Sequence, residues 1–464
     1  MQRERNNAKI LTLIQKLRRV KMGEINIISE GIAILILTII QEALIGLGTA
    51  CDGAEFLKEK TKRTLLLYMV GLVGIEKQAS CYKIHETIGK ISHDKFTRAL
   101  KGENILIGKL ALIFLNFCLI QTSSGTLIID DFLIPKEFSN KIEGVYYEFD
   151  HTTRQRIKGM RVVLILWTDG QIRIPIAWSI WHKEDKRLIG YSAKGRPRYE
   201  HTGQCLLHIN GQIIPYRTKN QISMSLLTDV LEKRIDPQYI TFDMWYANII
   251  NLKKIHWLHL LFYSRIKDNR NVIYLGEKLN LRTLALRFPI TSFDHKHGAF
   301  IKAIEVMLPS FGNIKLLMVR RDTHDESGET KFIFTNNLNA SAGEILLCYR
   351  TRWAIETVFR DLKQNLNVTS CQARTLCAQQ NHFALSLLTF VALEIQNLYS
   401  FDYCQLSSIG EKKLFLNSVS TLRSGREFFV MENKKMHSKI CKIELSPLYK
   451  VKDSMNLALD TLYF

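Results

Sequence analysis

The sequence lacks a hydrophobic run long enough to cross a membrane, and it lacks a nucleotide-binding P-loop. Its longest early apolar run, residues 32–40, stops at Gln41 and Glu42 and is too short to span the hydrocarbon core of a bilayer. Charged residues follow the first Met closely and no cleavage-site pattern follows a short apolar core, so we expect no secretory signal. No GxxxxGK motif followed by Ser or Thr occurs, which argues against an ATP-driven motor and a nucleotide cofactor.

The nine cysteines follow no repeated spacing, so the sequence also lacks a disulfide framework. Cys371 and Cys377 are separated by five residues, and His382 comes five positions later, which is not the spacing of zinc ligands. We therefore expect these two cysteines to be buried free thiols. An odd number of cysteines without a framework predicts a reducing compartment, the cytoplasm.

Acidic residues are scarce relative to basic ones. The chain has 44 Asp and Glu against 64 Lys and Arg, which gives a formal net charge of +20 and a pI near 9.5. This excess favours a polyanionic partner, and the lack of a membrane-spanning run makes nucleic acid a better prediction than a membrane surface. With 464 residues, 46% of them hydrophobic, the chain is globular and too long for one compact core, so two to four units are expected.

Residues 1–120 are predicted to be helical. Within them, residues 80–89 and 90–101 are two short helical patterns joined across Gly89. They are compatible with a helix-turn-helix that binds DNA, and equally with an ordinary helical hairpin that has a charged outer face. The cationic residues that would face DNA are Lys95, Arg98 and Lys101.

Short apolar segments of strand character begin at Gly125. A helical segment at residues 221–234 separates the first three of these strands from the next two, an order typical of an α/β unit around a mixed sheet. The predicted strands are residues 126–132, 161–167, 173–181, 239–243 and 257–265.

Two further β-like runs, residues 299–308 and 313–319, are separated by polar loops and indicate an insertion of mostly strand character. Residues 331–335 return to the sheet, a helix is predicted over residues 341–367, and an apolar helix over residues 383–398. The expected organisation has five parts: a helical N-terminal region 1–120, a first part of the core 121–265, the insertion 266–330, a second part of the core 331–400, and a C-terminal region 401–464 for which dimerisation is the hypothesis.

Two aspartates lie where strands are predicted to end. Asp130 ends the first strand and Asp243 ends the fourth, and open α/β sheets place their chemistry at the carboxyl ends of strands. If the two strands are neighbours, these side chains meet, although an aspartate at a strand end is also a common turn or helix-capping residue. Converging carboxylates need cations, and oxygen ligands suit Mg²⁺ or Mn²⁺.

The helix predicted after the insertion carries four residues, here called the tetrad: Tyr349, Arg352, Glu356 and Lys363. In a continuous α-helix their positions fall within about 60° of one another. One interpretation is a solvated helix in which Arg352 and Glu356 form an ion pair. The other is an active-site helix in which Glu356 joins the two aspartates as a metal ligand while the flanking cations contact phosphates.

The spacing of the tetrad, Tyr-x2-Arg-x3-Glu-x6-Lys, resembles the tyrosine/arginine/glutamate/lysine (YREK) signature of bacterial insertion-sequence transposases in the DDE superfamily. Asp243-Met-Trp-Tyr resembles the second-aspartate motif of that family, and Ile129-Asp130-Asp131 resembles its first. Phe132 departs from the family, which usually has Thr or Ser at that place. Asp130 and Asp131 are therefore both candidates for the first metal ligand, and the usual register of the motif favours Asp130.

The resemblance implies an α/β protein with a ribonuclease-H-like catalytic core and a mostly β insertion, preceded by a helical N-terminal DNA-binding region. It implies a transposase that binds the terminal inverted repeats of its own insertion sequence, cleaves the ends and joins 3′-hydroxyls to target DNA. This cut-and-paste reaction would proceed by two-metal-ion phosphoryl transfer. The implied catalytic and metal-binding residues are Asp130, Asp243 and Glu356, and the implied DNA contacts are Tyr349, Arg352 and Lys363.

The implied cofactors are two Mg²⁺ or Mn²⁺ ions, and the implied partners are double-stranded DNA and a second copy of the chain in the DNA complex. The expected location is the bacterial cytoplasm, at the nucleoid, with no membrane partner. Two alternatives stay open from the sequence: a transposase-derived DNA-binding protein without catalysis, and a metal-dependent DNA nuclease without strand transfer.

Overall fold

The computed structural model describes residues 59–88, 91–102, 125–150, 153–209, 212–232, 235–321, 330–399 and 408–413. The chain divides into two compact units. Residues 119–360 form the core unit, and residues 1–118 with residues 361–464 form the helical unit. The predictions for residues 1–58 and for most of residues 401–464 lie outside the described residues.

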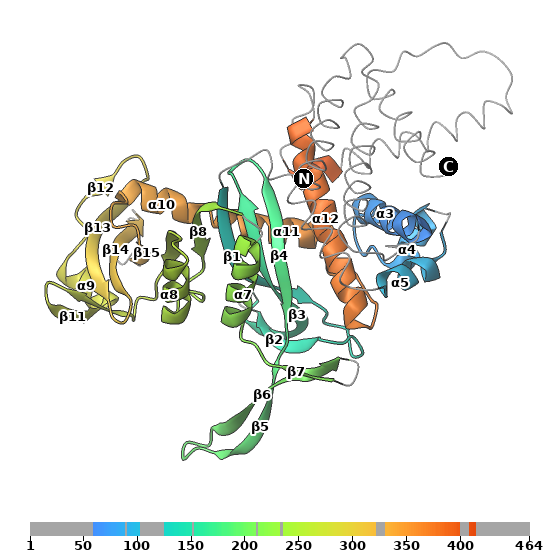
Figure 1. Ribbon diagram of the computed structural model, residues 1–464, viewed down its shortest axis with the longest axis horizontal. Helices are drawn as coiled ribbons and strands as arrows, with labels where there is room; N and C mark the ends of the chain where they lie inside the picture. Colours follow the sequence, from blue (N-terminus) through green and yellow to red (C-terminus); the bar gives the residue numbers. More distant parts are fainter. Residues whose placement is uncertain are drawn as a thin grey trace, which may run out of the picture. The chain divides into compact units, whose positions relative to one another are not determined.

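Five strands in the order β4-β3-β1-β8-β9 form the middle of the sheet of the core unit (Figure 1). Neighbours among the first three are antiparallel, whereas β8 is parallel to β1 and β9 is parallel to β8. The strands are β1 (Gly125–Pro135), β3 (Gln155–Thr168), β4 (Arg173–Trp181), β8 (Pro237–Phe242) and β9 (Phe262–Arg265), and β2 (Tyr146–Asp150) pairs with the start of β3. This arrangement confirms the predicted mixed sheet, with the first and fourth predicted strands as neighbours.

Two helices connect these strands. α7 (Lys219–Glu232) precedes β8, as predicted, and α8 (Ile249–Trp257) connects β8 to β9. The strand predicted over residues 257–265 is wrong in its first part, because Trp257 ends α8 and β9 begins only at Phe262. A short apolar run does not distinguish a helix end from a strand start, and the left-handed φ of 59° at His259 makes the turn between them.

The strands after β9 extend the same sheet, which has 12 strands among the described residues. β15 pairs antiparallel with β9, and β14, β13, β10 and β11 follow in that order. The elements are β10 (Asn271–Tyr274), β11 (Glu277–Asn280), α9 (Leu281–Arg287), β12 (Phe293–Asp294), β13 (Ala299–Leu308), β14 (Gly312–Arg321) and β15 (Lys331–Thr335). The strands predicted at residues 299–308, 313–319 and 331–335 are confirmed.

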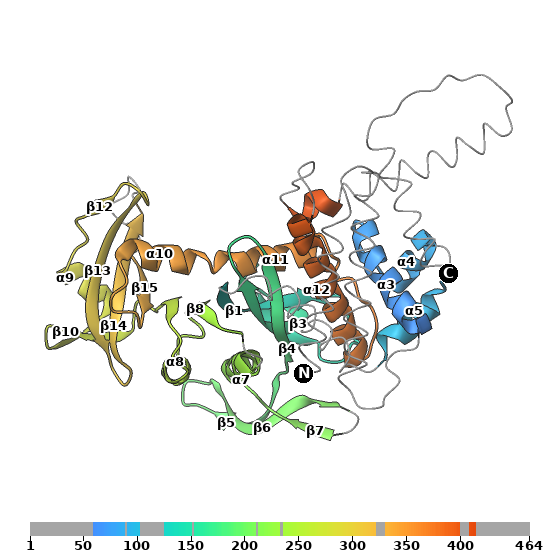
Figure 2. The ribbon, with the colours of Figure 1, turned by 45° about the horizontal axis from the view of Figure 1, so that its top comes forward.

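The helix predicted over residues 341–367 is broken into two helices that lie end to end (Figures 1 and 2). They are α10 (Ala342–Arg350) and α11 (Trp353–Gln364). At the break, Thr351 Oγ1 lies 3.4 Å from the carbonyl oxygen of Leu347, a local side-chain bond of the kind that competes with helical structure, and 2.9 Å from the hydroxyl of Tyr239. The single helical face predicted for the tetrad is therefore wrong: Tyr349 ends one helix, Arg352 lies in the break, and Glu356 is in the first turn of the next helix.

A separate three-stranded sheet lies between β4 and α7 in the chain. It consists of β5 (Glu184–Tyr191), β6 (Pro197–Ile209) and β7 (Gln212–Pro215), in the order β5-β6-β7. The sequence patterns did not predict it.

The helical unit contains α3 (Glu59–Gly74), α4 (Cys81–Ile88), α5 (His93–Leu100) and α12 (Leu376–Tyr399). Tyr68 Oη lies 2.9 Å from His382 Nδ1, and Asn381 Nδ2 donates to the carbonyl of Leu100 at 2.8 Å, so α12 packs with α3 and α5. Cys371 is a buried free thiol as predicted, whereas the free thiol of Cys377 is partly exposed. None of the described helices has the length and apolar character needed to cross a membrane.

Candidate active site

β1 and β8 are neighbouring parallel strands, and each carries an aspartate where their pairing ends. The last paired residues are Ile129 of β1 and Phe242 of β8, so Asp130 and Asp243 follow at the same level. β1 does not end at Asp130, as the sequence predicted, but continues along β3 to Pro135. The two aspartates nevertheless lie at the carboxyl end of the parallel pairing, where α/β sheets place their ligands.

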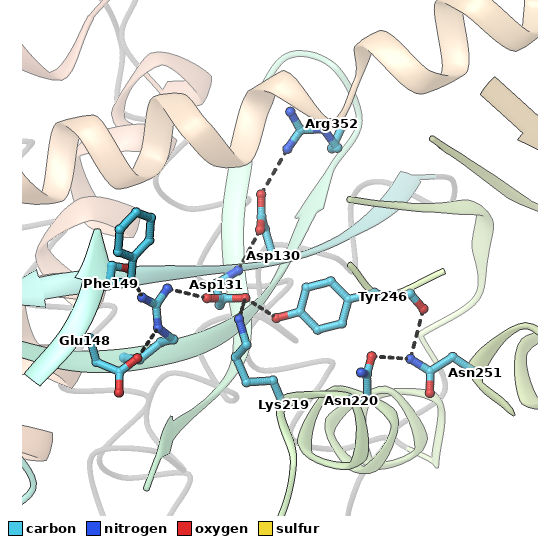
Figure 3. Close-up of polar contacts among 10 residues, drawn as sticks. Asp130, Asp131, Glu148, Phe149, Lys219, Asn220, Tyr246, Asn251 and Arg352 are labelled. Atoms are coloured by element: carbon cyan, nitrogen blue, oxygen red, sulfur yellow. Dashed lines mark hydrogen bonds and ion pairs between the residues drawn. The ribbon is translucent and has the colours of Figure 1, made fainter. Parts of the chain in front are cut away.

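Arg352 connects Asp130 to Glu356. Its Nη1 donates to Asp130 Oδ2 at 3.0 Å, and its Nη2 donates to Glu356 Oε1. The side chains are sheltered but reachable, with 17% of Asp130, 15% of Arg352 and 32% of Glu356 exposed. The i,i+4 ion pair of the first interpretation therefore exists, but its arginine also contacts a strand aspartate, and Figure 3 shows this contact between Arg352 and Asp130.

The surroundings of Asp130 oppose its ionisation. Burial and the carboxylates of Asp131 and Asp243 raise the pKa of Asp130 to about 7, although the guanidinium of Arg352 acts in the other direction. The effect of Asp243 on this pKa places the two strand-end carboxylates within electrostatic reach of each other. A carboxylate whose charge is opposed by its neighbours is a favourable position for a cation.

Asp131 lies on the opposite side of β1 from Asp130, since successive side chains of a strand alternate between its two faces (Figure 3). Its Oδ2 accepts a hydrogen bond from Arg161 Nη1 at 2.8 Å. Its Oδ1 accepts from Lys219 Nζ at 2.8 Å and from Tyr246 Oη at 2.7 Å. Burial alone would raise the pKa of Asp131, but Lys219 and Arg161 outweigh it and hold this pKa below its ordinary value.

The contacts of Asp131 join four parts of the core unit. Arg161 belongs to β3, Lys219 to the first turn of α7, and Tyr246 to the segment that follows β8. The backbone N–H of Tyr246 donates to the carbonyl of Asp243 at 2.9 Å, so the same network fixes the turn that carries the second aspartate. With only 7% of its side chain exposed, Asp131 is a structural anchor, and the geometry favours Asp130 as the residue that faces a ligand.

The other two members of the tetrad are Tyr349 and Lys363, at the ends of α10 and α11. The guanidinium of Arg352 lies 5.8 Å from the ring centroid of Tyr349. Burial raises the pKa of Tyr349, Arg352 lowers it and Asp243 raises it further, so the phenol lies in the field of the same charged cluster. Lys363 lies in the last turn of α11, seven residues after Glu356, and belongs to the helical unit.

Within the described ranges, no three His, Cys, Asp or Glu side chains converge closely enough to hold a metal ion. Asp130, Asp243 and Glu356 nevertheless offer only oxygen donors, the kind that Mg²⁺ and Mn²⁺ prefer. Arg352 already supplies one positive charge between Asp130 and Glu356, and the pKa of Asp130 is still raised. In donor type and in charge, these three carboxylates fit divalent ions.

A cationic and aromatic surface beside Asp243 is not indicated by any of the sequence motifs. Trp245 is 52% exposed, and Lys219 Nζ and Lys267 Nζ lie 5.0 Å and 5.4 Å from its ring centroid. The Asp243-Met-Trp-Tyr motif offered a signal for Trp245 and Tyr246, because they are its third and fourth residues. Lys219 and Lys267 carried no signal, since only the fold brings them to this place.

Comparison with known proteins gives matches over this region. Residues 200–391 match the family model described as "Transposase DDE domain", and residues 54–280 match the one described as "DDE superfamily endonuclease". The chain is 30% identical over 156 residues to the probable transposase for insertion sequence element IS5377 of Geobacillus stearothermophilus. That match covers 34% of this chain and 38% of the relative, so well under half of the relative is spanned.

A solved structure also resembles the chain at low similarity. It is the cryo-EM structure of a piggyBac transposase synaptic complex with hairpin DNA, with a TM-score of 0.46 and 11% sequence identity. The match covers 91% of this chain and 82% of that chain. A TM-score of this size does not define a shared fold.

Both matches cover β8, β9 and Asp243, whereas only the second covers β1 and Asp130 and only the first covers Glu356. The chain resembles the DDE superfamily of insertion-sequence transposases, as its motifs predicted. Its membership of the YREK group stays a prediction.

Proposed function

We propose that this protein is an insertion-sequence transposase that binds the terminal inverted repeats of its own element, cleaves them and joins the 3′-hydroxyls to target DNA by cut-and-paste transposition. One observation carries the proposal: Asp130 and Asp243 follow adjacent parallel strands at the same level, and Arg352 links Asp130 to Glu356. Two aspartates thus lie at one edge of the sheet, and an arginine joins one of them to Glu356, in a protein of net charge +20.

We also propose that the core unit has a ribonuclease-H-like core. Three antiparallel strands, β1, β3 and β4, are followed by two strands that extend the sheet in parallel on the other side of β1. α7 and α8 fall between the strands in the order that this fold requires. β10 to β14 would then be the mostly β insertion that separates Asp243 from Glu356.

In the proposed reaction, Asp130, Asp243 and Glu356 would hold two Mg²⁺ or Mn²⁺ ions. When bound, such ions make the attacking hydroxyl more acidic and stabilise the leaving oxygen of a phosphodiester. The contribution of the chain is to fix the three carboxylates and to supply cations around them. In strand transfer, a 3′-oxygen forms a bond to the target phosphorus while the target P–O3′ bond breaks, so no high-energy cofactor is consumed.

Tyr349, Arg352 and Lys363 would contact the DNA beside the cut. Arg352 is well placed for a phosphate, because a guanidinium binds carboxylate and phosphate in the same forked geometry. It would exchange Asp130 and Glu356 for the DNA backbone when the carboxylates acquire other cations. Trp245, flanked by two lysines, would add a surface on which a base can stack.

The helical unit would recognise the element ends. α4 and α5 are two short helices in sequence, and the cations of α5 that the helix-turn-helix hypothesis requires are exposed: Lys95, Arg98 and Lys101. The ordinary helical hairpin remains the alternative for this pair. Bringing two element ends together would require at least a homodimer on the DNA, and the protein would act in the bacterial cytoplasm at the nucleoid.

Glu356→Gln tests the proposed catalysis. The amide keeps the size of the side chain but removes the anionic oxygen, so we expect DNA cleavage to fall by at least about 100-fold. The measurement is single-turnover cleavage, in Mg²⁺, of a duplex that carries the inverted repeat flanking the gene. Strand-transfer product is scored in the same reaction.

The matched control is Glu305→Gln, the same chemical change at an exposed glutamate of β13, which should leave cleavage at the wild-type rate. Equal rates for wild type and Glu356→Gln would refute the proposed site. No cleavage by the wild type would favour a DNA-binding protein without catalysis. Cleavage without strand-transfer product would favour a metal-dependent nuclease.

A further inference from the structure

The hairpin formed by β5 and β6 is an arm that is uncovered on both faces. Nearly every residue from 185 to 204 is exposed, on strands that would normally bury one face. Figure 1 shows this hairpin extending beyond β7, away from the strands of the large sheet. An isolated two-stranded hairpin is at best marginally stable in water, so a partner surface is expected to complete it.

The base of the arm is held firmly. Glu184 is buried and its Oε2 lies 2.7 Å from His201 Nδ1, and Thr202 Oγ1 donates to the carbonyl of Asp185 at 2.6 Å. Cys205 is buried beside β7, where its thiol donates to the carbonyl of Pro215. These contacts join β5 to β6 and β6 to β7, and the exposed part of the arm begins just beyond them.

The outer part of the arm is strongly and uniformly basic. Between Lys186 and Tyr199 the sequence contains no carboxylate and five cationic residues: Lys186, Arg187, Lys194, Arg196 and Arg198. Lys186 lies 3.8 Å from Glu184. Glu200 lies opposite Arg187 across the two strands, but among the described residues no ion pair joins a carboxylate to the side chain of any of the other four. Four unneutralised cations on an exposed ribbon are a feature of polyanion-binding surfaces.

Apolar side chains accompany these cations. Leu188 and Tyr199 face each other across the two strands, and both are exposed, as are Ile189 and Tyr191. A purely apolar arm would favour a second copy of this chain as the partner. The chain has a net charge of +20, however, and the copy would bring its own basic arm, so charge favours a polyanion over another basic protein.

We propose that residues 186–199 are a second DNA-binding element, which inserts along a groove of duplex DNA and contacts the phosphates on its two sides. The major groove of B-DNA admits a two-stranded β-ribbon, and β5, with eight residues, spans about 25 Å, enough to reach across it. This inference rests on the proposed function, because it takes duplex DNA as the ligand. It adds a contact surface that none of the sequence motifs indicated.

The test compares two variants that remove the same charge. The arm variant replaces Arg187, Lys194, Arg196 and Arg198 with Gln. The control variant replaces four exposed lysines elsewhere in the core unit with Gln: Lys253, Lys278, Lys296 and Lys331. Binding of each full-length protein to a labelled 40-base-pair duplex is measured by fluorescence anisotropy over a series of KCl concentrations.

The arm variant should bind at least about tenfold more weakly near 100 mM salt, and its plot of log K against log salt should be less steep by about 3, since each lost phosphate contact changes that slope by about 0.9. The control variant should stay close to wild type. An arm variant with the affinity and slope of wild type would overturn the proposal, as would one that differs from wild type no more than the control does.

Two further measurements keep the result interpretable. Hydrogen exchange of amides 187–198 in the wild type should slow when the duplex is added, and unchanged exchange would overturn the proposal without involving any variant. Light scattering reports the oligomeric state: an arm variant that loses a wild-type dimer but keeps its DNA affinity would make a second copy the partner. Failure of the wild type to bind any duplex would instead overturn the proposed function itself.

Discussion

Asp131→Asn should lower the free energy of unfolding of the core unit by about 3–5 kcal/mol at pH 7.5, because it breaks a buried ion-pair network by removing one partner. Asp131 accepts hydrogen bonds from Arg161, Lys219 and Tyr246, and the neutral amide leaves Lys219 without this counter-charge and Arg161 with Glu148 alone. The pKa of Asp131 is lowered in the folded protein, so its stabilising effect is present above its ordinary pKa and is lost as pH falls through the lowered value. The measurement is urea unfolding followed by circular dichroism at pH 7.5 and at acidic pH.

Asp130→Asn is the matched control, since it is the same substitution one residue earlier in β1. The pKa of Asp130 is raised to about 7, so the folded protein binds a proton more readily there than the unfolded chain does. The stability linked to this group is therefore present below pH 4 and is lost as pH rises through about 7. Above pH 7, in the absence of divalent metal, Asp130→Asn should be as stable as wild type or up to about 4 kcal/mol more stable. If both variants lost stability equally, the distinction between anchor and ligand-facing aspartate would be wrong.

The same Asp130→Asn variant should lower the rate of DNA cleavage by about 100- to 1,000-fold or more. Asp130 faces Arg352, Glu356 and the end of β8, so the substitution removes a charged oxygen from the proposed reaction centre without disturbing the anchor network. Single-turnover cleavage of the inverted-repeat duplex in saturating Mg²⁺ measures the effect. Binding of the same duplex should change little by comparison.

Asp229→Asn provides the control for this activity measurement. Asp229 is an exposed residue of α7, in the same unit, and its substitution should leave the cleavage rate unchanged. A wild-type cleavage rate for Asp130→Asn, with the folded state intact, would remove Asp130 from the proposed site and would return Asp131 as the candidate.

The strands of the core unit were predictable because their apolar residues are local signals. The run at residues 161–167 is largely buried on the sheet and the run at 173–181 is buried in part, and the two aspartate-bearing strands are parallel neighbours, the condition under which their side chains were expected to meet. The tetrad spacing and the Asp243 motif led to the superfamily that the family models support. These features depend on residue order alone.

The break at Thr351 and Arg352 was not predictable, because neither Pro nor Gly marks it in the sequence; in the fold, Thr351 there meets the hydroxyl of Tyr239, more than a hundred residues earlier in the chain. The spacing of the tetrad predicted that all four side chains lie on one helical face. The break instead places Tyr349 and Glu356 in different helices, and Arg352 lies between Asp130 and Glu356. A spacing can therefore identify a motif while giving the wrong local geometry.

The choice between Asp130 and Asp131 also needed the fold. Adjacent strand residues point to opposite faces, and the sequence does not say which face carries Arg161, Lys219 and Tyr246. The β5–β6 arm escaped prediction for a related reason: its strands bury little, so they lack the alternation of apolar and polar residues that marks a half-buried strand.

The most direct test of metal-dependent DNA cleavage at Asp130, Asp243 and Glu356 is a single cleavage experiment on the inverted-repeat duplex. It compares the wild type in Mg²⁺, the wild type in EDTA, and the triple variant Asp130→Asn, Asp243→Asn and Glu356→Gln in Mg²⁺. We predict a product with a 3′-hydroxyl at the element end only for the wild type in Mg²⁺. The same product from the triple variant, or from the wild type in EDTA, would contradict the assignment of these carboxylates as a metal-dependent active site.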